Sequence, residues 1–310
     1  MRKLFAFAAA FLCAALACAG AEAAVPKVYF TKDISSAGLM KAYDALERKA
    51  EGKNIAVKIS TGEQGGHNFL APYLIKELVQ SLGANLVECN TAYGGARETT
   101  YNHVRVARGH GYTSIAYLDI MDADGTISLP VKNGKHLKED IVGSHFKDYD
   151  YFVVLSHFKG HGMAGFGGAI KNISIGIAAP QGKALIHSAG RSTSNMYCGE
   201  QLAFLESMAE AGKAVVDALD GKILYVNVMN RLSVDCDCSS NPAEPEMHDI
   251  GILASLDPVA LDQACVDLVY SAPDGRALIQ RMESRSGAHV LEYGEKIGLG
   301  SRKYELVKLD

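Results

Sequence analysis

The chain has 310 residues, a formal net charge of −4, no tryptophan and seven cysteines. A mildly acidic chain without a long basic run does not suit nucleic acid as a partner, because phosphate backbones are bound through clustered lysine and arginine. We therefore expect a small-molecule anion or a metal as the ligand.

Residues 1–24 have the layout of a secretory signal peptide. Two basic residues open this segment, Leu4–Ala19 is an apolar core, and Ala21–Ala23 has the small residues typical of a cleavage site. We expect cleavage and export across the inner membrane to the periplasm, with a lipoprotein anchored through Cys18 as the alternative. The apolar run is short for a membrane span and no second run follows, so no membrane span is expected.

The remaining chain, residues 25–310, alternates helix-like and strand-like segments. In Phe69–Leu82, for example, Leu70, Leu74 and Leu78 share one helical face, and a glycine follows the last turn. Short apolar runs between such segments predict strands, so we expect a single α/β domain with a parallel or mixed sheet flanked by helices. Two subdomains are the alternative, although no linker marks a boundary. Helices are expected over Ala37–Ala50, Phe69–Leu82, Thr99–Arg108, Glu200–Leu219 and Pro258–Tyr270, strands over Ile55–Ile59, Asn85–Cys89, Ser114–Leu118, Tyr151–Leu155, Ile223–Val228 and Ile250–Ala254, and a connection or small hairpin over Asp119–Asp148.

The segment Ser156–His187 is the strongest candidate for a functional site. It follows the buried strand predicted at Tyr151–Leu155, and open α/β sheets bind their ligands at the carboxyl ends of such strands. Its glycines allow backbone to approach a ligand, while its histidines and lysines supply cations and proton-transfer or metal-binding groups. The alternative is a mobile surface loop. The side chains in question are His157, Lys159, His161, Lys171 and His187.

Two earlier loops are expected at the same edge of the sheet. The glycine-rich turn Ser60–Asn68 carries His67, and Asn90–Thr100 carries Arg97. We predict that these two side chains, with His157 and Lys159, bind the anion together with backbone N–H groups.

The Cys236-Asp237-Cys238 sequence is a second chemical signal. Alternate residues of an extended segment point to opposite faces, so the two thiols can converge only if the chain turns, which the following polar residues allow. Converged thiolates could hold a transition metal. A redox-labile pair, or one disulfide to Cys198 or Cys265, is the alternative, because the exported compartment is oxidising. Three further side chains have structural interpretations: Cys89 as a buried small hydrophobe, Asp257 as a helix cap, and Asp262 as a solvent-facing or supporting residue.

Four segments together resemble the domain-of-unknown-function family three-six-two, whose members are commonly called iron-sulfur centre proteins. Many relatives carry a ferredoxin module with clustered cysteines. The present chain has no CxxCxxC run, so a cysteine-ligated iron-sulfur cluster of the ferredoxin type is not expected. The segments are Ser156–Lys171, Asp235–Cys238, Asp249–Asp262 and Tyr293–Tyr304.

The spacing of His161, Lys171 and His187, with glycines between the first two, distantly resembles the N-terminal domain of the nickel-pincer lactate racemase family. By position, the resemblance implies that Lys171 anchors a pincer cofactor, His187 ligates nickel and His161 moves the substrate proton. Those racemases use a second catalytic histidine on an earlier loop, and Asn90–Thr100 contains none.

Two hypotheses of function follow. The first is an enzyme that acts on a small hydroxy acid or a similar anion by proton or hydride transfer, with His161 and Lys171 as catalytic residues facing one cavity. The second is a non-catalytic metal- or redox-binding protein that partners an electron-transfer, iron-sulfur system. It holds nickel, iron or zinc through Cys236, Cys238 and a third ligand, whose ligand atoms should then surround one point.

Overall fold

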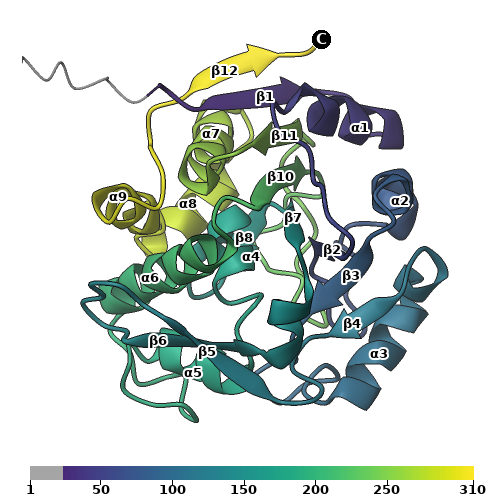
Figure 1. Cartoon of the computed structure of the whole chain (residues 1–310). Coiled ribbons are helices and arrows are strands. Elements are labelled where there is room, and N and C mark those ends of the chain that lie inside the picture. Colours follow the sequence, from purple (N-terminus) through teal and green to yellow (C-terminus); the bar gives the residue numbers. More distant parts are fainter. Residues whose placement is uncertain (1–23) are drawn as a thin grey trace, which may run out of the picture.

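The computed structural model describes residues 24–310 (Figure 1). The predicted signal-peptide features, including Cys18, lie in residues 1–23, outside the described part. Within the described residues, no helix has the length and apolar character needed to cross a membrane.

A central eight-stranded sheet confirms the predicted α/β class. Its strands lie in the order β12-β1-β11-β10-β7-β2-β3-β4, and only β11 runs antiparallel to its neighbours. Ligand-binding edges of such sheets lie at the carboxyl ends of the parallel strands, here β10, β7, β2, β3 and β4. The strands are β1 (Lys27–Thr31), β2 (Ile55–Lys58), β3 (Asn85–Glu88), β4 (Leu118–Ile120), β7 (Tyr151–His157), β10 (Ile223–Met229), β11 (Gly251–Ser255) and β12 (Glu305–Lys308).

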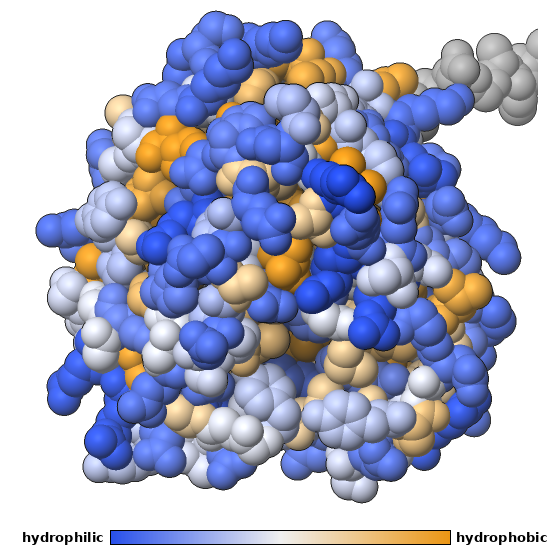
Figure 2. Space-filling view, turned by 180° about the vertical axis from the view of Figure 1, so that it is seen from behind, coloured by the Kyte–Doolittle hydropathy of each residue, from blue (hydrophilic) through white to orange (hydrophobic). Residues whose placement is uncertain are grey.

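Helices cover both faces of this sheet, and the face seen from behind is mostly hydrophilic with scattered apolar residues (Figures 1 and 2). The central strand β7 shows why two layers form. Phe152 and Val154 join the core on one face, whereas Val153 and Leu155 join the core on the other, because successive side chains of a strand alternate. The first core packs under α4 (Ala169–Ile173), α5 (Pro180–His187), α6 (Gln201–Leu219), α7 (Pro258–Ser271), α8 (Arg276–Ser284) and α9 (His289–Lys296), and the second under α1 (Ser36–Ala45), α2 (Pro72–Ser81) and α3 (Thr100–Gly109).

Several boundaries differ from the sequence predictions for identifiable reasons. The side chain of Ser35 caps α1 by accepting the N–H of Gly38 at 3.1 Å, but the helix ends at Ala45 and not at Ala50. Helix α2 begins at Pro72, which suits the first turn because its missing N–H is not needed there. The edge strand β12, its neighbour β1 and the helices α8 and α9 were not predicted.

A connection or a small hairpin was predicted for the polar segment after β4, and the structure has the hairpin. Strands β5 (Thr126–Pro130) and β6 (Glu139–Gly143) pair antiparallel, and short 3-10 turns occupy Tyr112–Ser114 and Ser144–Asp148.

The glycine-rich segment is not a mobile surface loop. It folds into the hairpin β8 (Lys159–His161) and β9 (Gly165–Gly167), and then into α4 and α5. All residues of both hairpin strands are buried. Gly160 permits this burial, because a Cβ there would lie 2.3 Å from the carbonyl oxygen of Val234.

Candidate functional site

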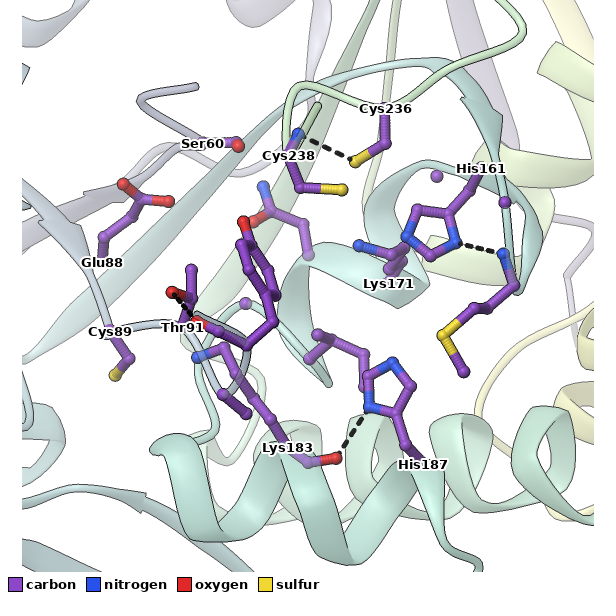
Figure 3. A pocket seen from close by; sticks show the side chains of 18 of the residues that line it. Ser60, Glu88, Cys89, Thr91, His161, Lys171, Lys183, His187, Cys236 and Cys238 are labelled. Carbon is purple, nitrogen blue, oxygen red and sulfur yellow. Dashed lines mark hydrogen bonds between the residues drawn. The ribbon is translucent and has the colours of Figure 1, made fainter. Parts of the chain in front are cut away.

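A cavity of about 270 Å³ lies at the carboxyl ends of β2, β3, β7 and β10 (Figure 3). The position is the one predicted for a ligand site in a sheet of this kind. Eight of the predicted site residues line this cavity: Arg97, His157, Lys159, His161, Lys171, His187, Cys236 and Cys238.

His67 lies elsewhere. Its Nε2 is 2.8 Å from Oε1 of Glu244 and its side chain is 39% exposed, so it is paired at the surface. Ser60, at the start of the same loop, does line the cavity.

Helix α4 carries Lys171, and a buried carboxylate fixes where this short helix begins. The oxygens of Asp262 accept the backbone N–H groups of Ala169 at 2.7 Å and Ile170 at 2.9 Å. A Cβ at Gly168 would lie 2.3 Å from Oδ1 of Asp262, so glycine is required there. Burial raises the pKa of Asp262 to about 6. Asp262 is therefore a buried support for the lysine and not part of a solvent face.

His161 presents one nitrogen to the cavity in a fixed protonation pattern. Its Nδ1 accepts the backbone N–H groups of Met163 at 3.2 Å and Ala164 at 2.9 Å. Since that nitrogen is an acceptor, the proton of the neutral ring is on Nε2, which faces Lys171 across the cavity wall (Figure 3). Burial, reinforced by the charge of Lys171, lowers the pKa of His161, so the ring is a neutral hydrogen-bond donor.

His187 is held in the opposite tautomer. Its Nδ1–H donates to the carbonyl oxygen of Lys183 at 2.7 Å, and the ring stacks on Phe204 with centroids 4.6 Å apart. Burial lowers the pKa of His187 to about 3, so the ring is neutral. Its free Nε2 offers a lone pair, which is the form in which histidine accepts a hydrogen bond or ligates a metal.

The two thiols of Cys236 and Cys238 converge because the chain turns at this point, as the metal hypothesis required. Together with a ring nitrogen of His161, their sulfurs lie within 4.8 Å of one another. His187, the nickel ligand implied by the racemase resemblance, is not a member of this group, and the metal-binding roles of His187 and of the two thiols stay predictions. All five cysteines in the described part of the chain are free thiols.

Asp237, between the two cysteines, fixes the turn to the β7–β8 segment. The carboxylate of Asp237 receives Nδ1–H of His157 at 2.8 Å and the ammonium of Lys159 at 2.7 Å. The other nitrogen of His157 lies 2.7 Å from the carbonyl oxygen of Asn230. The carboxylate thus neutralises Lys159 and hydrogen-bonds to His157, and both residues were predicted to bind the anion.

Arg97 is also neutralised within the protein. Its guanidinium contacts Glu88 at 3.2 Å and Glu63 at 3.5 Å, and these three side chains are almost fully buried. Glu88 also lies 2.8 Å from Nε2 of His103. This network fixes the loop after β3 against the cavity, and leaves less of the arginine charge for a ligand than the sequence suggested.

Two further lysines, missed by the sequence analysis, line the cavity. Burial lowers the pKa of Lys58 to about 8 and also lowers that of Lys183. The ammonium of Lys58 donates to the carbonyl oxygen of Ile59 at 2.5 Å and to Oδ1 of Asn172 at 2.9 Å, and that of Lys183 donates to the carbonyl oxygen of Ala178. A lysine inside the apolar run Ile55–Ile59 was the available signal, because buried lysines need a reason.

The fold and the cavity define an α/β protein with a partly enclosed, cation-rich site at the carboxyl edge of its sheet. The chain belongs to the family described as Domain of unknown function (DUF362), whose model matches residues 55–267. This range includes both the glycine-rich segment and the cysteine turn, and it confirms the family predicted from the sequence.

Comparison with individual proteins gives only remote similarities. No curated protein matches the chain. The chain is similar to the lactate racemase apoprotein from Thermoanaerobacterium thermosaccharolyticum, with 15% identity, a TM-score of 0.48, and coverage of 78% of this chain and 56% of that one. It is also similar to a protein from Thermotoga maritima, with 13% identity, a TM-score of 0.43, and coverage of 84% and 58%. The chain therefore spans little more than half the length of these two structures.

Proposed function

We propose that the cavity binds a small organic anion, such as a hydroxy acid, and that the protein is an enzyme acting on it. The observation that carries the proposal is the charge around the cavity. Lys58, Lys171 and Lys183 all line it, and within the described residues none of them forms a salt bridge. Lys58 and Lys183 are buried, and Lys171 is partly buried. Buried charges are normally paired, so an anionic ligand supplies the missing counter-charge.

The internal ion pairs sharpen this argument. Asp237 already serves Lys159, and Glu88 and Glu63 already serve Arg97. A carboxylate among the remaining three ammonium groups would make charge-assisted hydrogen bonds, which are stronger than neutral ones. A cavity of about 270 Å³ is small for a ligand pocket and suits a small organic anion.

The neutral groups on the wall are placed to act on such a ligand. His161 offers an N–H donor and His187 a lone pair, so one can polarise a carbonyl or hydroxyl oxygen while the other accepts a hydrogen bond. In its predicted role as acid or base, His161 would give its Nε2 proton to the ligand and take a proton back from the ligand to return to its starting form. Lys171 lies beside it, as the enzyme hypothesis requires (Figure 3).

Binding is tested by thermal shift and calorimetry with lactate, succinate and inorganic phosphate, and with uncharged lactamide as the control ligand. We expect the carboxylates to raise the Tm and lactamide to leave it unchanged, because ligands that bind only the folded state stabilise it. Lys171→Met and Lys183→Met should weaken carboxylate binding about ten- to a hundredfold, the worth of a charged hydrogen bond. The matched control is Lys76→Met, at an exposed position of α2. Loss of binding in the control, or no stabilisation by any anion, would reject the proposal.

Catalysis is tested separately from binding. Incubation with hydroxy acids in deuterated water should exchange the carbon-bound proton next to the carboxylate, followed by NMR. His161→Gln and Lys171→Met should abolish the exchange, while Lys76→Met should not. Binding without exchange or redox turnover would leave the non-catalytic hypothesis.

We further propose that the protein works outside the inner membrane, on the strength of the signal-like residues 1–24. Amino-terminal sequencing of protein from a periplasmic extract tests this, and an intact Met1 would contradict it.

A further inference from the structure

Cys236 and Cys238 form a pair of thiols on the cavity wall whose chemistry the binding of an anion does not use. The backbone N–H of Ser239 donates to the carbonyl oxygen of Cys236 at 2.9 Å and closes a tight turn. Asp237 points out of this turn into its ion pairs with His157 and Lys159. Both sulfurs are therefore brought to the same side, within 4.8 Å of each other, which an extended segment would not allow.

The surroundings of the pair supply groups that stabilise negative charge on Cys236. Its Sγ accepts the backbone N–H of Cys238 at 3.4 Å. A ring nitrogen of His161 lies within 4.8 Å of both sulfurs, and Lys171 lines the same cavity. Hydrogen-bond donors and cations beside a sulfur favour its thiolate form.

Cys89 also lines the cavity, but its surroundings differ from those of Cys236 and Cys238. Its S–H donates to the carbonyl oxygen of Ile177 at 3.1 Å, and burial raises its pKa to about 12. Only thiolates attack disulfides at an appreciable rate. Cys89 is therefore inert where the pair is nucleophilic.

We propose that Cys236 and Cys238 are a redox-active dithiol that exchanges with a small anionic disulfide bound in the cavity. The inference rests on the proposed function for the binding of the anion. The sulfur of Cys236 forms a bond to one sulfur of the ligand, the ligand S–S bond breaks, and the departing thiolate takes the proton of Cys238. The sulfur of Cys238 then attacks that of Cys236 and releases the second thiolate, which is protonated by water. The protein loses two electrons and the ligand disulfide gains them.

The charge of the cavity selects the disulfide. Lys58, Lys171 and Lys183 attract carboxylates on the ligand and repel amines. The donor Nε2–H of His161 is next to the thiols and can hydrogen-bond to sulfur as charge moves from one atom to the next (Figure 3).

The test compares dithiodiglycolate, a small dianionic disulfide, with cystamine, a dicationic one, on the reduced full chain. Intact-mass analysis and peptide mapping should show loss of two hydrogens and a bond between Cys236 and Cys238. The protein should react faster with dithiodiglycolate than with cystamine. The ratio of these two rates should exceed the same ratio measured with free mercaptoethanol by on the order of ten- to a thousandfold. The ratio should fall in Lys171→Met. Cys238→Ser should stop at one mercaptoacetate on Cys236, and Cys236→Ser should not react. Cys198→Ser, outside the cavity lining, should behave like the unaltered chain.

Three outcomes would overturn the proposal. The first is equal preference for the two disulfides in the unaltered chain, and the second is a mixed disulfide on Cys198 in place of Cys236. The third is a tightly held metal ion that protects both thiols from dithiodiglycolate, which would instead support the metal-binding hypothesis. Succinate binding to Cys236→Ser separates the two levels of inference. If succinate binds but the disulfide does not react with the unaltered chain, the anion site stands and the dithiol does not; if neither occurs, both fail.

Discussion

Replacing Lys58 by Met should change the stability of the protein in a direction that reverses with pH. The ammonium of Lys58 is buried in the sheet at the cavity floor, where burial lowers its pKa from 10.5 to about 8. This shift corresponds to a cost of about 3 kcal/mol for the charged form in the folded state. The cost is fully present below pH 8, and it is relieved as the pH rises from 8 towards 10.5, because the folded chain then releases its proton before the unfolded chain does.

Methionine has a similar shape and carries no charge, so the substitution removes this cost. It also removes two hydrogen bonds, to the carbonyl of Ile59 and the amide oxygen of Asn172, worth about 1 kcal/mol each. The net expectation at pH 7 is a gain of about 1 kcal/mol in the free energy of unfolding. At pH 10 the unaltered protein no longer bears most of the cost, and Lys58→Met should be less stable by about 1 kcal/mol.

Urea unfolding at pH 7, 8, 9 and 10 measures this difference, with the exposed Lys76→Met as control. Taking differences between variants cancels the titration of the other buried groups. A stability difference that stays constant over this range, or a loss of several kcal/mol at pH 7, would refute the reasoning. The same variant should bind succinate more weakly, so greater stability and weaker binding should occur together.

Three further substitutions test the supports of the site and the buried charges. Gly168→Ala should lower stability by about 1–3 kcal/mol, since its Cβ would meet the carboxylate that caps α4 at 2.3 Å, whereas Gly109→Ala, with no atom in reach, should be nearly neutral in urea titration. Burial raises the pKa of Asp140 from 3.8 to about 8, so between these pH values the folded chain binds a proton that the unfolded chain does not. The free energy of unfolding should therefore fall as the pH rises over this range. Asp140→Asn should flatten this slope in urea titrations at several pH values, and an unchanged slope would contradict the assignment. Asp237→Asn should cost about 3–5 kcal/mol by leaving Lys159 buried without its partner, and a cost below about 1 kcal/mol would show that the ion pair is not needed.

Many of the regular elements of the fold could be predicted from local pattern alone. The apolar runs around β2, β7 and β10 are buried on both faces, so they read as strands without any tertiary information. Amphipathic spacing likewise indicated α2 and α6. The edge strand β12 has no fully buried residue, and so its sequence carries no comparable signal.

The site was predictable to the extent that parallel strands place their following loops at one edge. Tyr151–Leu155 followed by a glycine-rich segment was enough to bring His161, Lys171 and His187 to one cavity. The sequence did not reveal which cations are already paired. Lys159 and Arg97 were candidate anion ligands, yet carboxylates at distant positions of the chain neutralise them.

By itself, the sequence determined the α/β class, the family and the segment that forms the cavity, because these follow from hydrophobic periodicity and from short local motifs along the chain. Only the tertiary structure decided which charges remain unpaired, which nitrogen of each histidine carries the proton, and that the two thiols share a face. Which charges are paired depends on contacts between residues far apart in the chain, such as Lys159 with Asp237, and local pattern contains no information about such pairs. The tautomers of His161 and His187 and the turn of the two thiols depend on nearby backbone groups, which only the folded backbone brings into place.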